Sequence, residues 1–140
     1  MRIIAKITGC LAIFLLATEV TGGEEKFGDV IVHFASVPSL LIPADVAEAH
    51  GIVRSRNRIV TNVAVHHHGG AVAASVNGLA TNLLHQQIQL EFAEVREGKA
   101  IYYVASNVIA QSERLSIELY VTPQPTGEAL VVRYHRRFLE

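Results

Sequence analysis

Residues 115–121, LSIELYV, alternate apolar and polar side chains without interruption. Every second residue from Leu115 to Val121 is a branched aliphatic, and the residues between them are Ser116, Glu118 and Tyr120. A β-strand sends successive side chains to opposite faces, so this period of two predicts a strand with one face in a core. The pattern decides the fold class, because it recurs along most of the chain.

The same alternation extends outward on both sides of this stretch. Short turns separate the candidate strands, as at Gly69-Gly70, at 96–99 and at 123–127. The stretch 43–50 breaks the pattern and predicts one short helix, with Gly51 as its stop. About seven short strands predict a single immunoglobulin-like β-sandwich. The other predicted strands are 27–35, 58–66, 71–81, 87–95, 100–105 and 130–138.

Two interpretations compete between Val72 and Leu90. Asn77-Gly78 is typical of a tight hairpin turn. That turn would leave a very short return strand before Asn82. We therefore favour one long strand through Thr81, a loop at 82–86 and a new strand from Gln87.

The first 22 residues have the order of a secretory signal peptide. Arg2 and Lys6 precede an apolar run over residues 7–17, and small residues follow it. Glu19 ends the run well short of the roughly 20 apolar residues of a stable membrane span, so no stable anchor is expected after cleavage. Cleavage after residue 17 or 22 fits equally well. We expect an exported, periplasmic protein whose single domain is 23–140.

Cysteine content and charge exclude several classes of protein. Cys10 is the only cysteine and lies in the leader, so the mature domain is predicted to fold without disulfides. Most of the apolar run follows Cys10 rather than preceding it, which makes lipidation the minor interpretation. The net charge of −1 gives no overall drive toward nucleic acid or an anionic membrane.

Several short stretches, spread over nearly the whole mature chain, carry a family resemblance. They are 27–29, 32–34, 49–57, 81–84, 96–103, 121–123, 132–134 and Phe138. Together they resemble domain-of-unknown-function family 4426, small exported proteins of Gram-negative bacteria. The resemblance implies an exported, β-rich single domain, and it implies no catalytic residues because no activity is assigned to that family. One departure is the run of three histidines at a hairpin tip.

The three consecutive histidines, His66 to His68, are the sharpest local feature. Imidazole is a common ligand for zinc, copper and nickel. In an extended segment only His66 and His68 share a face, so these two are the candidate metal ligands and others would have to come from elsewhere. An ordinary exposed hairpin tip is the competing interpretation.

Two rows of basic residues are candidate anion- or partner-binding sites. Guanidinium groups aligned on one strand face suit phosphate or carboxylate. Charged residues also protect strand edges from aggregation, which is the competing explanation. The rows are Arg54, Arg56 and Arg58, and Arg133, His135 and Arg137.

No sequence template for catalysis is present, and the mature domain has no cysteine nucleophile. The leading hypothesis is a non-catalytic periplasmic binding or interaction module that needs no cofactor. It would engage an envelope protein through an exposed strand edge. The alternative is a metal-binding protein or metal-dependent enzyme using His66 and His68. Enzymatic activity is not expected on this sequence, and the sequence leaves the oligomeric state open.

Overall fold

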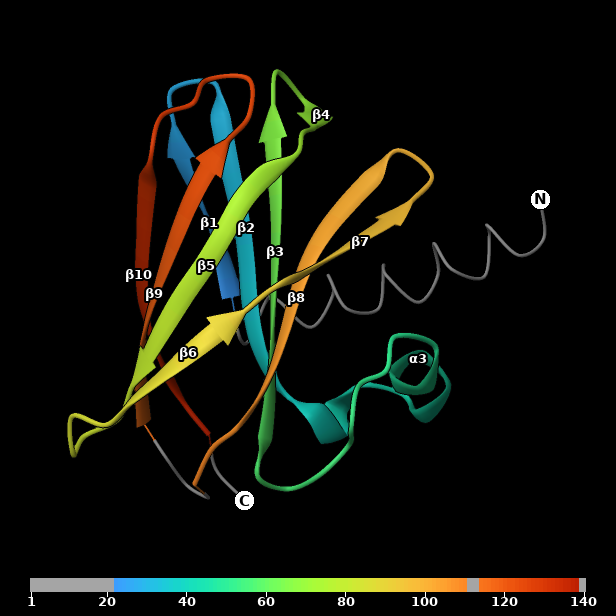
Figure 1. Ribbon diagram of the computed structural model, residues 1–140, viewed down its shortest axis with the longest axis vertical. Helices are drawn as coiled ribbons and strands as arrows, with labels where there is room; N and C mark the ends of the chain where they lie inside the picture. Colours follow the sequence, from blue (N-terminus) through green and yellow to red (C-terminus); the bar gives the residue numbers. More distant parts are fainter. Residues whose placement is uncertain (1–21, 111–113, 139–140) are drawn as a thin grey trace.

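The computed structural model describes residues 22–110 and 114–138, which form two antiparallel sheets packed face to face (Figure 1). The first sheet, sheet A, has the order β1-β2-β3-β8-β7, with the short β4 also paired to β3. Its strands are β1 (Gly22–Phe27), β2 (Val30–Pro38), β3 (Arg58–His67), β4 (Gly70–Ala71), β7 (Ala93–Glu97) and β8 (Ala100–Val108).

The second sheet, sheet B, has the order β10-β9-β5-β6. Its strands are β5 (Ala74–Thr81), β6 (Gln87–Glu91), β9 (Arg114–Pro123) and β10 (Leu130–Arg137). The LSIELYV stretch lies in β9, and its aliphatic residues are fully buried while the residues between them are only partly covered. The predicted β-sandwich is therefore confirmed.

The main core lies between the sheets. Alternate residues of each strand supply it, among them Val32, Val63, Leu90 and Leu119. A second, smaller core covers the outer face of sheet A, where Val37 and Val60 meet the segment after β2. That segment holds the 3-10 turn η1 (Ser39–Leu41) and the helix α3 (Ala44–Ala49), which is the short helix expected at 43–50.

Strand number and several boundaries differ from expectation. Gly28 has φ +63° and forms a turn, so the predicted strand at 27–35 begins only at Val30, and a separate strand, β1, precedes the turn. The predicted strand at 87–95 is broken at Phe92: β6 belongs to sheet B and β7 to sheet A. The described residues form ten strands rather than about seven. The loop at 82–86 is confirmed.

The predicted leader, apart from Gly22, lies outside the described residues. Cleavage after residue 17 would keep β1 whole, whereas cleavage after residue 22 would remove its first residue. Within 22–110 and 114–138, no helix is long and apolar enough to cross a membrane.

The sandwich has two ends with different residues. At one end β2, β5, β8 and β10 finish while β3, β6 and β9 begin, as the strand registers show. We call this the basic end, after Arg54, Arg56, Arg58, Arg114, Arg136 and Arg137. The opposite end carries the β1–β2, β3–β4 and β7–β8 turns and the β9–β10 connection, and we call it the histidine end after His66 to His68.

Candidate anion-binding site

An open cavity of about 350 Å³ lies at the basic end, and four basic side chains line it. They come from the first residue of β9 and the last three of β10, which are neighbouring antiparallel strands. Three guanidinium groups around one opening can bind a carboxylate or phosphate through paired hydrogen bonds. The lining residues are Arg114, His135, Arg136 and Arg137.

Arg114 and Arg137 are direct cross-strand partners. Like charges placed opposite each other destabilise a strand pair. Residues of the described chain that line the cavity include no carboxylate that would offset this repulsion. A bound anion would offset this repulsion.

Arg136 lies on the inner side of β10 and is held in place by three contacts. Its Nε donates to the Ser36 carbonyl at 3.2 Å, its Nη1 donates to the Arg137 carbonyl at 3.1 Å, and its Cζ lies 5.1 Å from the Phe138 ring centroid. Burial lowers the pKa of Arg136 from its usual value. An arginine fixed in this way loses little conformational freedom when it binds an anion.

The three residues of the predicted row on β10 do not share the same surroundings. His135 and Arg137 line the cavity, and His135 Nδ1 lies 3.1 Å from Ser116 Oγ. Arg133 instead forms an ion pair with Glu118, with 3.1 Å between Nε and Oε2. The structure therefore brings together two of these three predicted residues and adds Arg114 and Arg136.

The predicted row of Arg54, Arg56 and Arg58 is not a strand face. β3 begins only at Arg58, and the chain before it is a loop from α3. Arg54 donates to the Leu40 carbonyl at 3.1 Å, and Arg58 donates to Ser106 Oγ at 3.4 Å. The extended arrangement needed to align the three guanidinium groups is absent, because this loop turns to pack on η1.

His66 and His68 have different neighbours. His66 is on the outer face of sheet A, with its ring centroid 4.9 Å from that of His33 on β2. His68 lies in the turn, has φ 51°, and faces Asp29 at 3.9 Å. Glu24 Oε2 lies 3.4 Å from His33 Nδ1. Among the residues that the structure describes, no group of three or more His, Cys, Asp or Glu side chains could hold a metal ion.

Burial and the nearby His33 both lower the pKa of His66, in that order of importance. Acidification therefore places charge on a partly covered ring beside another imidazole. This arrangement responds to pH.

A largely buried carboxylate lies on β7. Glu97 Oε1 is 3.5 Å from His50 Nε2, and the Glu97 side chain is 9% exposed. Its Oε2 is buried and has no hydrogen-bond partner. Burial raises the pKa of Glu97, and His50 opposes that shift. The stretches 49–57 and 96–103, far apart in sequence, meet through this pair.

Two tyrosine hydroxyls join the sheets near opposite ends. The hydroxyl oxygen of Tyr134 in sheet B lies 2.6 Å from Ser36 Oγ of sheet A, and Ser36 Oγ is 3.0 Å from Thr61 Oγ1. Burial is the main cause that raises the pKa of Tyr134 to about 12. This hydroxyl cluster lies directly behind Arg136 and supports the cavity wall.

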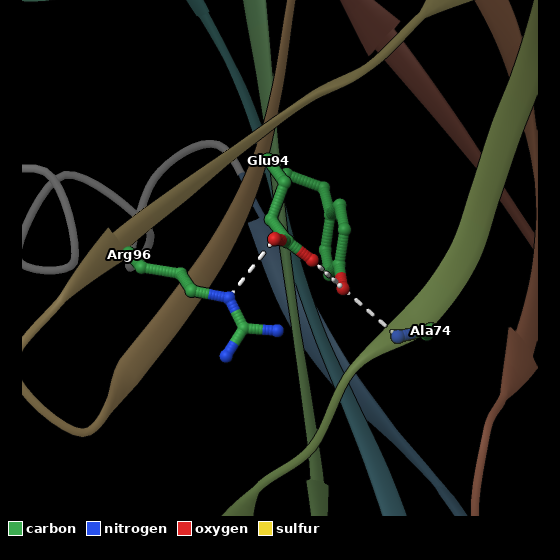
Figure 2. A network of polar contacts seen from close by, with 4 residues as sticks. Ala74, Glu94 and Arg96 are labelled. Carbon is green, nitrogen blue, oxygen red and sulfur yellow. Dashed lines mark hydrogen bonds and ion pairs between the residues drawn. The ribbon is translucent and has the colours of Figure 1, made fainter.

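Tyr103 of sheet A makes the other connection (Figure 2). Its hydroxyl accepts from the Ala74 amide at 2.8 Å and donates to Glu94 Oε1 at 3.0 Å. Arg96 Nε in turn donates to Glu94 Oε2 at 2.9 Å. Of the adjacent tyrosines, Tyr103 faces the main core, and Tyr102 lies buried on the other face of β8.

Comparison with known proteins identifies relatives of the whole domain. A crystal structure of a DUF4426 family protein from Pseudomonas aeruginosa is 33% identical, with a TM-score of 0.75, and the match covers 85% of this chain and 95% of that one. FetP of a uropathogenic Escherichia coli strain, expressed in the periplasm, shares the fold at 9% identity and a TM-score of 0.63, covering 85% and 94%.

A copper-bound variant of FetP matches similarly, at 10% identity and a TM-score of 0.62, covering 84% of this chain and 95% of that one. No curated protein matches this chain. The family model for the domain of unknown function DUF4426 matches residues 24–140. The chain therefore belongs to the DUF4426 family.

Proposed function

We propose that this protein is an exported, non-catalytic binding module that holds an anionic group of an envelope component in the arginine-lined cavity. The cross-strand pair of Arg114 and Arg137 carries the proposal, because its mutual repulsion is offset by an anion. Arg136 adds a third guanidinium that its contacts to Ser36 and Phe138 hold in position.

Export to the periplasm is supported by the leader over residues 1–22, with its basic start and apolar run. FetP, which has the same fold, was expressed in the periplasm. At 9% identity that likeness concerns the fold alone, so the leader is the main support for this compartment.

The cavity is a better candidate than a strand edge for contacting a partner. The edge strands β1, β7 and β10 carry charged residues, and β6 carries glutamines and a glutamate. Charged edges resist the addition of another strand. Binding of an envelope protein through a strand edge stays a prediction.

The test is a titration of the domain with inorganic phosphate, in which binding is monitored by the NMR chemical shifts of the arginine side chains. We expect Arg114→Gln combined with Arg137→Gln to weaken binding about tenfold or more, since each charge-assisted contact contributes roughly 1.5–3 kcal/mol. Arg133→Gln is the matched control, because this exposed arginine on the same strand pairs with Glu118. Equal affinity of the double variant and the wild type contradicts the proposal.

Metal binding is a second candidate, favoured by the contact between His33 and His66. The two imidazoles lie on one sheet face, and further ligands would have to come from elsewhere. Calorimetry with zinc separates this set from the pair predicted by sequence. Loss of binding in His33→Ala but not in His68→Ala assigns the site to the sheet face, and the reverse assigns it to the turn.

A further inference from the structure

The exposed large apolar side chains of the described residues all lie at the basic end. Two are in η1, one is in the loop before β3, two are in the β5–β6 loop, and one ends β8 opposite Arg58. These elements lie at the same end of the sandwich, in the lower part of the view in Figure 1. The residues are Leu40, Leu41, Val53, Leu83, Leu84 and Val108.

Leu83 and Leu84 are the most exposed of the set, at 74% and 78%. The loop that carries them, 82–86, bonds to itself. Asn82 Oδ1 accepts from the Leu84 and Gln86 amides at 3.0 and 2.9 Å. The Asn82 amide donates to the Gln86 carbonyl at 3.1 Å, and the His85 amide donates to the Asn82 carbonyl at 3.0 Å.

The hydrogen bonds within the loop affect the cost of moving it into a nonpolar layer. A backbone amide that enters an apolar phase without a partner is costly. Here the amides of Asn82, Leu84, His85 and Gln86 are bonded within the loop. Insertion of this loop into a nonpolar layer would therefore keep these four amides hydrogen-bonded.

Basic groups lie at the same end of the sandwich as these apolar side chains. Thr81, the last residue before the loop, pairs with Ser116, which pairs with His135 of the arginine-lined cavity. The leucine loop and the cavity thus share one end of sheet B. On the side of sheet A, Arg54 donates to the carbonyl of Leu40, next to Leu41 and Val53. The nearby helix α3 contributes two acidic residues, Asp45 and Glu48.

We propose that the basic end docks on the surface of an anionic lipid bilayer. Leu83 and Leu84 enter the boundary between headgroups and acyl chains, and the arginine-lined cavity holds a lipid phosphate. The second part rests on the proposed function, because it uses the same cavity. Apolar side chains with arginines among them match the two layers of such a surface.

The arrangement favours a bilayer over a protein partner. The apolar residues come from four separate segments with basic groups between them. A specific protein interface has a contiguous, desolvated core with polar groups around it. A fluid lipid surface needs no such core, because lipids rearrange around each protruding side chain.

The experiment is co-sedimentation of residues 18–140 with vesicles. This chain contains every described residue and lacks the apolar leader, which would itself bind lipid. We expect binding to phosphatidylcholine vesicles that contain phosphatidylglycerol, with about tenfold weaker binding to phosphatidylcholine alone. Added salt reduces binding because it screens the arginines. Equal sedimentation with both vesicle types overturns the proposal.

The decisive variant is Leu83→Ser with Leu84→Ser, two exposed positions whose change leaves the core intact. We expect it to bind mixed vesicles about tenfold more weakly than the wild type. Thr126→Ser is the matched control in an exposed connection at the histidine end and leaves binding unchanged. Wild-type vesicle binding by the leucine variant overturns the docking proposal.

The phosphate titration separates the two proposals. A leucine variant that loses vesicles but keeps inorganic phosphate supports docking on lipid. If the variant with Arg114→Gln and Arg137→Gln still binds vesicles while the leucine variant does not, the leucines dock on lipid but the cavity does not hold a lipid phosphate. If the leucine changes abolish self-association in sedimentation velocity and leave vesicle binding intact, the surface contacts a second copy and the lipid proposal is wrong.

Discussion

The two ends of the sandwich are joined across the sheets in the same way but carry different chemistry. Near each end a tyrosine from one sheet bonds to the other: Tyr134 reaches Ser36, and Tyr103 reaches Ala74. At the basic end the contacts behind the surface are neutral hydroxyls, and the surface carries arginines and leucines. Toward the histidine end Tyr103 of sheet A also bonds to Glu94, which extends the network to Arg96 at the surface.

The comparison shows that a domain of nearly neutral charge can still be strongly polar in space. The chain has 12 basic and 13 acidic residues. The fold gathers six arginines at the basic end and leaves carboxylates such as Asp29, Glu97 and Glu128 at the histidine end. Attraction to an anionic surface depends on this local distribution rather than on the total charge.

The largest expected effect on stability comes from truncating a core side chain at the basic end. Phe138 is 5% exposed and packs in the main core beneath Arg136. Phe138→Ala should lower the free energy of unfolding by about 3 kcal/mol or more, because it leaves a cavity. Val30→Ala, in the core at the histidine end, should cost about 2 kcal/mol. Urea unfolding measures both, and a larger loss for Val30→Ala would reverse the comparison.

The two tyrosine connections should differ in strength. Tyr134→Phe removes the partner of Ser36, whose side chain is fully buried beside Thr61, and should cost about 1–2 kcal/mol. Tyr103→Phe removes the bonds to Glu94 and to the Ala74 amide, and should cost about 1 kcal/mol or less, since Glu94 is exposed and Ala74 is only partly buried, so water replaces both bonds. Equal losses in chemical denaturation would show that burial does not distinguish the ends.

Glu97 should destabilise the protein as pH rises. Burial raises its folded pKa above the ordinary carboxyl value of 4.5, so the folded state binds the proton more tightly than the unfolded state. Stability then falls as pH rises from about 4.5 through the folded pKa. Glu97→Gln removes that loss and should be more stable than the wild type at neutral pH in thermal unfolding. Glu48→Gln, exposed on α3, is the control expected to change little.

The smallest expected effect is the response of His66 to acid. Its folded pKa is lowered from 6.5, so the unfolded state binds the proton more tightly. The stability from neutral His66 is present above pH 6.5 and is lost as pH falls through the folded pKa. His66→Gln should flatten the curve of stability against pH in that range. A wild-type slope in His66→Gln would contradict the assignment.

Much of the fold could be predicted from the sequence because burial of one sheet face imposes a period of two. This holds for β9, whose buried and partly covered residues alternate, whereas β3 is buried on both faces from Ile59 to Val65. The break at Phe92 was missed although the alternation changes phase there: the apolar residues are 88, 90 and 92 before the break and 93 and 95 after it, where the chain changes sheets. β1 was missed since its burial pattern is almost wholly exposed and gives no apolar alternation.

The candidate site was predicted in part. His135 and Arg137 could be named because they alternate on one strand, yet Arg133 has the same pattern and is neutralised by Glu118 on the neighbouring strand. Arg114 was missed although the turn at 123–127 places it opposite Arg137 by counting along the hairpin. Leu83 and Leu84 could not be singled out, because exposure of a loop side chain follows from the loop's internal bonds.

The single residue between β6 and β7 has a mechanical consequence. Phe92 links sheet B to sheet A on one side of the sandwich, so the sheets cannot move far apart there. On the other side, β1 and β10 are separate edges, and Phe34 and Ser36 of β2 contact Tyr134 of β10. Partial opening therefore begins along β10 and rotates about Phe92. Amide protons of β10 should exchange with solvent before those of β5.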